Sequence, residues 1–179
     1  MIGNPPVGGK VPPVATPAPL VYARPSMSRI GVISDTHGLV RPEALRALAG
    51  AELIVHAGDV GGPEVLDALR AVAPVVAVRG NNDRGPWAAA LAETEVVETA
   101  GRSLYVLHDL KELDLDPRAA GFDAVIAGHS HQPRIDRRAG VLYLNPGSAG
   151  PRRFRLPIAV AWLAIEPTGL DAEIVQLDV

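Results

Sequence analysis

The chain has no cysteine, few aromatic residues and no long apolar run. Phe, Trp and Tyr together make up 4% of its 179 residues. The absence of cysteine excludes disulfides, thiolate zinc sites and cysteine nucleophiles. Any bound metal ion must therefore be held by nitrogen and oxygen ligands, which suit manganese, iron, zinc, nickel or magnesium. No apolar run is long enough to cross a bilayer.

The chain also lacks an excess of positive charge. It carries 17 Lys and Arg against 20 Asp and Glu, for a net charge of −3. A broad basic surface is therefore not expected, which argues against nucleic acid as a binding partner. The length suffices for one domain with a sizeable core.

Proline, by contrast, is abundant near the start of the chain. Large apolar residues are few there, so we predict a Pro-rich disordered tail over residues 1–28, with a linker or docking segment as the alternative. Translation starting at Met27 is a further hypothesis. The segment lacks the charged start and apolar core of a signal peptide, and we expect a cytoplasmic protein. The prolines are Pro5, Pro6, Pro12, Pro13, Pro17, Pro19 and Pro25.

From residue 29 onward, apolar strands alternate with helices. Continuous apolar runs of this kind are typical of parallel βαβ units. Proline near the first turn favours both helices. The expected strands are 30–34, 53–57 and 75–78, and the expected helices are 42–49 and 63–72.

The second half reads as mostly antiparallel, with a short helix at 87–91. A polar link, residues 109–121, leads to a strand at 124–127. The remaining strands are expected at 95–99, 103–107, 135–137, 141–144, 158–165 and 170–177.

Polar side chains of metal-binding type follow five of the predicted strands. Asp35 and His37 stand two residues apart, so in an extended chain both point to the same side. Four of the five histidines occupy such positions. Because sites in α/β sheets form at the carboxyl ends of strands, we expect these side chains to meet. They are Asp35, His37, Asp59, Asn81, His108, His129 and His131.

The order of these short motifs is more specific than any one of them. They are Asp-x-His at 35–37, Gly-Asp at 58–59, Gly-Asn-x-Asp at 80–83, His108, and Gly-His-x-His at 128–131. In this order and spacing they resemble the calcineurin-like metallophosphoesterase superfamily. Short linkers and the Asn-Pro-Gly-Ser turn at 145–148 resemble its small single-domain phosphodiesterase branch. The resemblance covers roughly residues 29–150, and we expect one metallophosphoesterase domain over residues 29–179.

The resemblance also implies an α/β fold of two facing mixed β-sheets flanked by helices, with two divalent metal ions at one edge. A metal-bridging hydroxide would attack phosphorus. Manganese is favoured because relatives commonly use it, and Ni²⁺, Zn²⁺, Fe²⁺ or Mg²⁺ are alternatives. One ion would be held by Asp35, His37, Asp59 and His131. The other would be held by Asp59, Asn81, His108 and His129. The expected catalytic residues are Asp59, Asn81 and His129.

Two positions depart from the family pattern. Many relatives with phosphatase activity have a histidine where this chain has Asn82, and an amide cannot act as a general acid. The family usually has glycine where this chain has Asp109. That carboxylate is expected to point to solvent, with orientation of a ligand or narrowing of the substrate cleft as alternatives.

Other polar residues are interpreted as mainly structural. We expect His56 to pack within its strand, and Asp83 to hydrogen-bond a ligand or the backbone. Asn145 and Ser148 either face the site or form a structural turn. Trp87 is expected in the core, as is Trp162. A solvated surface is favoured over a phosphate clamp for Arg134, Arg137, Arg138, Arg152, Arg153 and Arg155.

The function expected from these features is a dinuclear metal-dependent phosphodiesterase or phosphatase that acts on a small phosphate ester. Phosphodiesterase activity is favoured over monoesterase activity. The alternative is a non-catalytic metal-binding scaffold, because a eukaryotic retromer subunit shares the fold and serves mainly as a binding protein. Family precedent also leans towards a homo-oligomer. The substrate-binding residues are not evident from the sequence.

Overall fold

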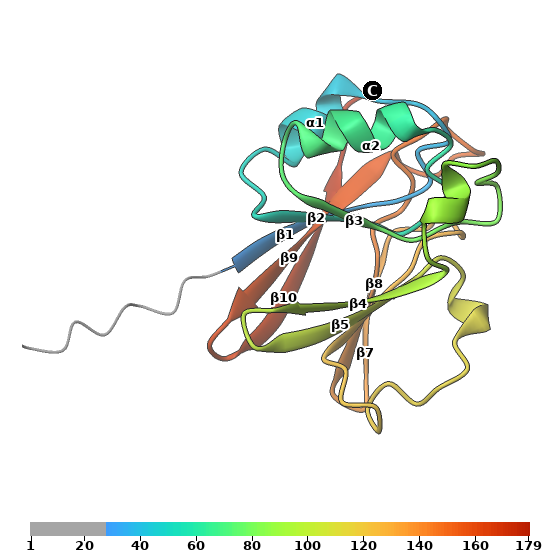
Figure 1. The fold of residues 1–179 in the computed structure, drawn as a ribbon. Coiled ribbons are helices and arrows are strands. Elements are labelled where there is room, and N and C mark those ends of the chain that lie inside the picture. Colours follow the sequence, from blue (N-terminus) through green and yellow to red (C-terminus); the bar gives the residue numbers. More distant parts are fainter. Residues whose placement is uncertain (1–27) are drawn as a thin grey trace, which may run out of the picture.

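The computed structural model describes residues 28–179, which form two facing five-stranded sheets (Figure 1). The expected fold class, two facing mixed sheets with flanking helices, is confirmed. The predicted tail and the hypothetical start at Met27 lie outside the described residues, except that Ser28 already belongs to the first strand. Within residues 28–179, no helix is both long and apolar enough to cross a membrane.

The first sheet has the strand order β10-β9-β1-β2-β3. Strands β1, β2 and β3 are parallel, and β9 and β10 form an antiparallel pair at one edge, where β9 runs antiparallel to β1. The strands are β1 (Ser28–Ile33), β2 (Leu53–His56), β3 (Val75–Ala77), β9 (Ala159–Glu166) and β10 (Gly169–Gln176).

Two short helices, α1 (Pro42–Ala47) and α2 (Pro63–Arg70), cover the outer face of the first sheet (Figure 1). Each begins with proline, whose fixed φ suits the first turn. Both end two residues earlier than predicted. Trp87 packs in the cluster beneath the helices and Trp162 is buried in β9, so the prediction that both are structural is confirmed.

The second sheet has the order β4-β5-β6-β8-β7. Its strands are β4 (Thr94–Thr99), β5 (Arg102–Leu107), β6 (Ala124–Ile126), β7 (Arg134–Arg138) and β8 (Val141–Asn145). The hairpins β4–β5 and β7–β8 are antiparallel, but β5–β6 and β6–β8 are parallel, which the expectation of a mostly antiparallel half missed. The polar link after β5 is a crossover, and parallel pairing requires such a connection.

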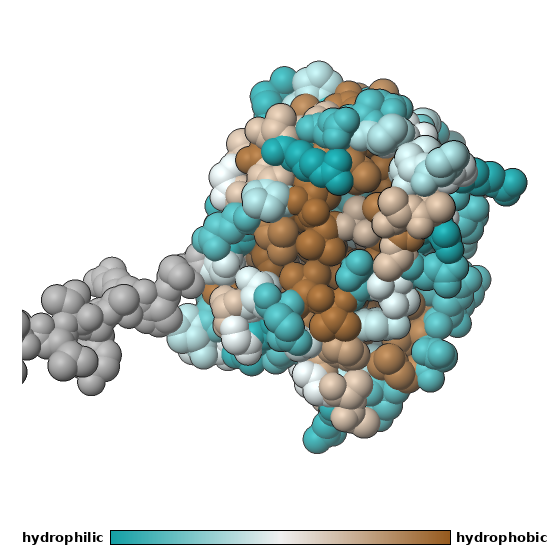
Figure 2. Space-filling model, in the orientation of Figure 1, coloured by the Kyte–Doolittle hydropathy of each residue, from teal (hydrophilic) through white to brown (hydrophobic). Residues whose placement is uncertain are grey.

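The main core lies between the two sheets. Side chains such as Val32, Val55 and Leu163 from the first sheet meet Leu104 and Ile126 from the second. The seam between the sheets shows as a band of apolar surface in Figure 2. The outer face of the second sheet carries no α-helix among the described residues. Two short 3₁₀ helices complete the described elements. The first, η1 (Ala88–Ala90), precedes β4, and the second, η2 (Leu110–Glu112), lies in the link after β5.

Candidate metal centre

The seven residues predicted to bind metal lie in loops that follow five strands. Asp35 and His37 follow β1, Asp59 follows β2, and His108 follows β5. Asn81 comes after β3, and the loop after β6 carries His129 and His131. Because strands from both sheets end at this edge, residues far apart in sequence come within bonding distance of one another.

Three of these side chains form a first group. The Nε2 atoms of His37 and His131 lie 3.4 Å apart. His131 Nε2 lies 3.3 Å from Asp35 Oδ1. One ligand atom from each of the three residues falls within 4.8 Å of the other two. This compact set of nitrogen and carboxylate oxygen has the spacing of a metal site.

A second group forms around Asn81. Its Oδ1 lies 3.1 Å from His108 Nε2 and 3.1 Å from His129 Nδ1. His108 Nε2 is also 3.4 Å from Asp59 Oδ2. The same Asp59 Oδ2 lies 3.8 Å from His37 Nε2 in the first group. One carboxylate oxygen therefore stands between the two groups, which is the position of a bridging ligand.

The backbone at this edge is strained. Asp35, His37, Asp59, His129 and His131 all have positive φ, between 48° and 66°. Left-handed backbone at a non-glycine residue costs on the order of 1–3 kcal/mol and persists only where the surroundings enforce it. Here the loops after β1 and β2 are joined by hydrogen bonds from Asp35 N to the Gly58 carbonyl (3.0 Å) and from His37 N to the Asp59 carbonyl (3.0 Å).

Hydrogen bonds keep the Asp59 carboxylate ionised. Asn82 donates its backbone N–H to Oδ1 (2.8 Å) and its amide Nδ2 to Oδ2 (2.6 Å). Burial raises the pKa of Asp59, but the interaction with His108 in its protonated form and the hydrogen bonds from Asn82 outweigh burial and hold the pKa below its usual value. An ionised, buried carboxylate at this point favours the binding of a cation.

His108 is held in one tautomer. Its Nδ1 lies 2.8 Å from the Ala57 carbonyl, which can only accept, so Nδ1 carries the proton and donates it. Burial lowers the pKa of His108, but the contacts with Asp59 and the Ala57 carbonyl outweigh burial and the net pKa is raised. In the neutral form, the lone pair on Nε2 faces Asp59 and Asn81, where a metal would bind.

Three buried side-chain atoms among the described residues have no hydrogen-bond partner: Asp35 Oδ1, His131 Nδ1 and His56 Nδ1. The first two belong to proposed metal ligands and so test the fit of a metal. Asp35 Oδ2 accepts from Ser34 Oγ (2.7 Å) and His129 N (3.0 Å), whereas Asp35 Oδ1 accepts from nothing and faces His131. The Nδ1 atom of His131 is likewise unpaired among the described residues. An orphaned carboxylate oxygen beside imidazole nitrogens is expected where a divalent cation completes the set. The residues fit such an ion.

Several neighbouring polar residues support the loops instead of facing the site. Asp83 accepts from the backbone N–H groups of Val60 (3.1 Å), Gly61 (2.8 Å) and Gly80 (2.8 Å), which confirms the backbone role expected for it. The fully buried His56 packs with Nε2 2.9 Å from Thr36 Oγ1, as predicted.

The Asn145–Ser148 turn has the structural role that is one of the two alternatives, and Asn145 in addition lines a cavity beside the site. Asn145 Nδ2 donates to the Gly128 carbonyl (2.6 Å) and so braces the loop that carries His129. Ser148 Oγ donates to the Asp35 carbonyl (2.9 Å). Both contacts tie β8 and its following turn to loops of the site.

Asp109 does not point to solvent, so that expectation is wrong. Its Oδ2 lies 3.6 Å from His129 Nε2, on the opposite side of the ring from Asn81. Its Oδ1 accepts from Lys111 N (3.0 Å) and caps η2. Because η2 turns the chain immediately after β5, the carboxylate is directed back over the edge of the sheet.

One arginine reaches the site, although the sequence favours a solvated surface over a phosphate clamp for all six arginines of residues 134–155. Arg153 Nη2 lies 3.4 Å from His37 Nε2. Arg134 and Arg138 instead pair with Asp136 at 3.3 and 3.0 Å. Arg153 belongs to a non-periodic segment between β8 and β9, so the sequence does not distinguish it from the other five arginines.

Comparison with known proteins shows which family this chain resembles. A model described as the calcineurin-like phosphoesterase superfamily domain matches residues 28–168. A probable metallophosphoesterase of Methanothermobacter thermautotrophicus is 37% identical over 159 residues, which cover 82% of this chain and 91% of that relative.

Solved structures agree on the fold. An archaeal phosphodiesterase has a TM-score of 0.69 at 22% identity, covering 82% of this chain and 99% of that one. Vps29 of Entamoeba histolytica, in a structure complexed with Zn²⁺, has a TM-score of 0.63 at 24% identity and covers 83% and 98%. These identities show a shared fold alone. The family match and the 37% identical relative establish that this chain belongs to the calcineurin-like phosphoesterase superfamily.

Proposed function

We propose that the protein is a dinuclear metal-dependent phosphoric ester hydrolase that prefers phosphodiesters. The observation that carries this proposal is the position of Asp59 Oδ2, which lies 3.8 Å from His37 Nε2 and 3.4 Å from His108 Nε2. Membership of a metallophosphoesterase family implies divalent metal ions, and the geometry offers two groups of ligands that share one carboxylate.

In this proposal one ion is held by Asp35, His37, Asp59 and His131, and the other by Asp59, Asn81, His108 and His129. Manganese is the first candidate because relatives in the superfamily commonly use it, and a set of imidazole and oxygen ligands without thiolate is compatible with it. A bound pair of such ions supplies Lewis-acid activation of the phosphoryl group and of the attacking water.

The chain's own residues prepare this chemistry. Asp59 stays ionised through its hydrogen bonds with Asn82, and the Ala57 carbonyl fixes the tautomer of His108. Asn81 and His129 border the exposed side of the second group, and with Asp59 they are the proposed catalytic residues. Arg153, beside His37, adds a positive charge where an anionic ester would approach.

The position at which many relatives carry a proton donor for the leaving-group oxygen does not supply one in this chain. The Asn82 amide that replaces the usual histidine is engaged with Asp59 Oδ2 at 2.6 Å. Since general acid catalysis contributes about 10²–10⁴-fold, esters with low-pKa leaving groups should react much faster than alkyl esters. Equal rates for bis(p-nitrophenyl) phosphate and a dialkyl phosphate would contradict this expectation.

The direct test is hydrolysis of bis(p-nitrophenyl) phosphate by metal-stripped protein, titrated with manganese, nickel, zinc or magnesium. We expect activity to return with metal and to be absent in Asp59→Asn. A matched control is Asp116→Asn, because the carboxylate of Asp116 is exposed and only caps a turn. Hydrolysis of the corresponding monoester at a higher rate would remove the preference for diesters.

A non-catalytic scaffold is the second candidate, because the fold is also that of Vps29. Metal binding without turnover of any phosphate ester would favour it over the hydrolase. The expected cytoplasmic location and homo-oligomer stay predictions.

A further inference from the structure

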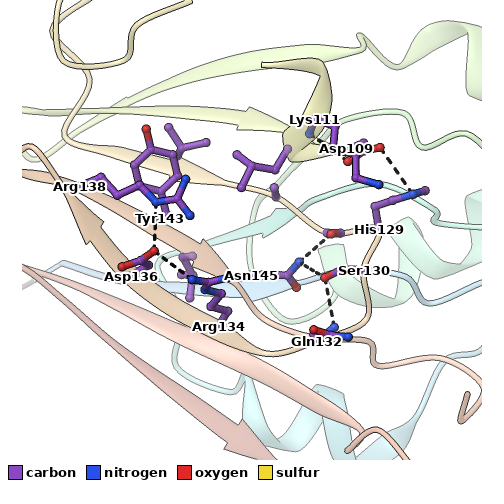
Figure 3. A pocket seen from close by; sticks show the side chains of 15 residues that line it. Asp109, Lys111, His129, Ser130, Gln132, Arg134, Asp136, Arg138, Tyr143 and Asn145 are labelled. Atoms are coloured by element: carbon purple, nitrogen blue, oxygen red, sulfur yellow. Dashed lines mark hydrogen bonds and ion pairs between the residues drawn. The ribbon is translucent and has the colours of Figure 1, made fainter. Parts of the chain in front are cut away.

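A cavity of about 460 Å³ lies on the outer face of the second sheet and begins at the metal edge (Figure 3). A smaller cavity of about 300 Å³ is lined by Asn81 and His108. Asp109 and His129 line both cavities. The two cavities are therefore neighbours that share these side chains, and the larger one adjoins the proposed metal site at His129.

The metal site is open on this side. The His129 side chain is 39% exposed, against 15% for His37 and 5–6% for His108 and His131. A phosphate ester held by the metals can extend its organic group past Arg153 beside His37, or along the more exposed route over His129. That route leads to the larger cavity on one side and to the smaller one on the other.

The interior of the larger cavity suits a flat apolar group. Its floor includes Val125 and Ala127, which point outward from the second sheet, and Leu110 of η2 also lines it. At the end away from His129, the Arg138 guanidinium lies 4.7 Å from the centre of the Tyr143 ring (Figure 3). Aromatic rings and guanidinium planes are surfaces on which aryl groups and bases stack.

The two cavities differ in the charge they present. The larger one carries Lys111, Arg134 and Arg138 against Asp109 and Asp136, so its formal charge is positive. The smaller one carries Arg79 against Asp83, Asp109, Glu93 and Glu112, so its formal charge is negative. A group attached to an anionic phosphate therefore meets less repulsion in the larger cavity than in the smaller one.

We propose that this cavity binds a planar aromatic ester group, an aryl group or a nucleoside, attached to the phosphate at the metal site. The proposal rests on the proposed function, because the metals anchor the phosphate. Tyr143 and Arg138, which do not bind metal, would then select the substrate. The candidate substrates are nucleotides and aryl phosphate esters.

The test is calorimetric binding of three anions to the manganese-loaded full-length protein, at alkaline pH where all are dianions. Methylphosphonate, phenylphosphonate and thymidine 5′-monophosphate each offer a phosphonate or phosphate dianion to the metals. They differ in the one attached organic group, which is methyl, phenyl or a nucleoside. We expect at least one aromatic anion to bind about tenfold more tightly than methylphosphonate. A gain for both indicates stacking alone, whereas a gain for one identifies the aryl or the nucleoside as the preferred arm.

Substitutions test which residues cause the higher affinity for the aromatic anions. Tyr143→Ala should remove most of it and leave methylphosphonate binding unchanged. Tyr105→Ala is the matched control, because Tyr105 lies in the same apolar cluster, stacks on Phe122 with ring centroids 5.0 Å apart, and does not line the cavity. Arg138→Ala, at an exposed position, gives a second test that does not depend on how well Tyr143→Ala folds.

The outcomes separate this proposal from the proposed function. Equal affinity for all three anions, or equal losses in Tyr143→Ala and Tyr105→Ala, would overturn the aromatic cavity while the metal-bound anion site stands. Failure of the manganese-loaded protein to bind any of the three would remove the anchor, and both proposals would fall.

Discussion

Single residues in this site are oriented by neighbours that do not themselves bind metal. Asp109 shows this best, because its carboxylate lies 3.6 Å from His129 Nε2 while His129 Nδ1 faces Asn81 Oδ1 at 3.1 Å. A carboxylate on one ring nitrogen orients the imidazole and makes the other nitrogen a better ligand. The residue that departs from the family pattern is thus placed to support the second metal.

We therefore predict that Asp109→Asn weakens manganese binding at the second site by about 10-fold or more. The asparagine retains an oxygen for Lys111 N, so the change removes mainly the charge. Calorimetric titration of the metal-free variant measures the effect, with Asp116→Asn as the control from the same link. Two unchanged binding steps would show that Asp109 does not position His129.

The candidate ligands were within reach of sequence analysis because each follows an apolar run that forms a strand. The orientation of Asp109 and the approach of Arg153 to His37 were not, because both residues lie in irregular segments. No periodicity in those segments reports which way a side chain points. Tertiary packing alone places these two charges at the site.

At the scale of elements, the loops after the parallel strands form one unit. Asp83, after β3, accepts hydrogen bonds from Val60 and Gly61 in the loop after β2. Gly80 permits this packing, because a Cβ there would lie 2.1 Å from Asp59 N and 2.2 Å from Asp59 Oδ1. The position of Asn81 relative to Asp59 thus depends on a residue with no side chain.

Gly80→Ala should accordingly separate the two loops. We expect a loss of about 1–3 kcal/mol in the free energy of unfolding, together with weaker manganese binding. Gly140→Ala is the control, because an added Cβ there would meet nothing within 4 Å. Gly140 has φ of +89° and Gly80 does not have a positive φ, so Gly140→Ala carries a backbone penalty without a clash and Gly80→Ala carries the clash alone. Chemical denaturation and metal titration of both variants give the comparison. Intact metal affinity in Gly80→Ala would contradict the role given to this contact.

The strands and helices were largely predictable, and the pairing of β5, β6 and β8 was not. Apolar runs and proline positions mark where elements begin and end. Whether adjacent strands run parallel depends on the path of the connection between them. The link between β5 and β6 is polar and contains only η2. Because it has no crossover α-helix, nothing in the sequence indicates that the two strands are parallel.

At the scale of the whole molecule, a buried histidine links stability to pH. His56 is fully buried, and burial lowers its pKa from 6.5 to about 4. Thr36 Oγ1 donates to the Val60 carbonyl (2.8 Å), so it accepts from His56 Nε2–H and the neutral ring is the one that fits. Protonation of His56 therefore favours the unfolded chain.

The sign of the pH effect follows. Above pH 6.5 both states hold neutral His56, and between pH 6.5 and 4 only the unfolded state binds the proton. The free energy of unfolding should fall over that interval by about 3 kcal/mol on account of this residue. Denaturation of the wild type and of His56→Gln across the interval measures the difference. Parallel pH profiles for the two proteins would exclude His56 as the cause.

The two sheets contribute ligands to one shared edge, and the central claim is that this edge holds a catalytic pair of metal ions. The most direct test titrates metal-free protein with manganese, at a protein concentration well above the dissociation constants, while following hydrolysis of bis(p-nitrophenyl) phosphate. We predict that activity rises to a sharp break at two ions per chain. Full activity at one ion per chain would contradict the dinuclear site, and manganese binding without hydrolysis at any ratio would contradict catalysis.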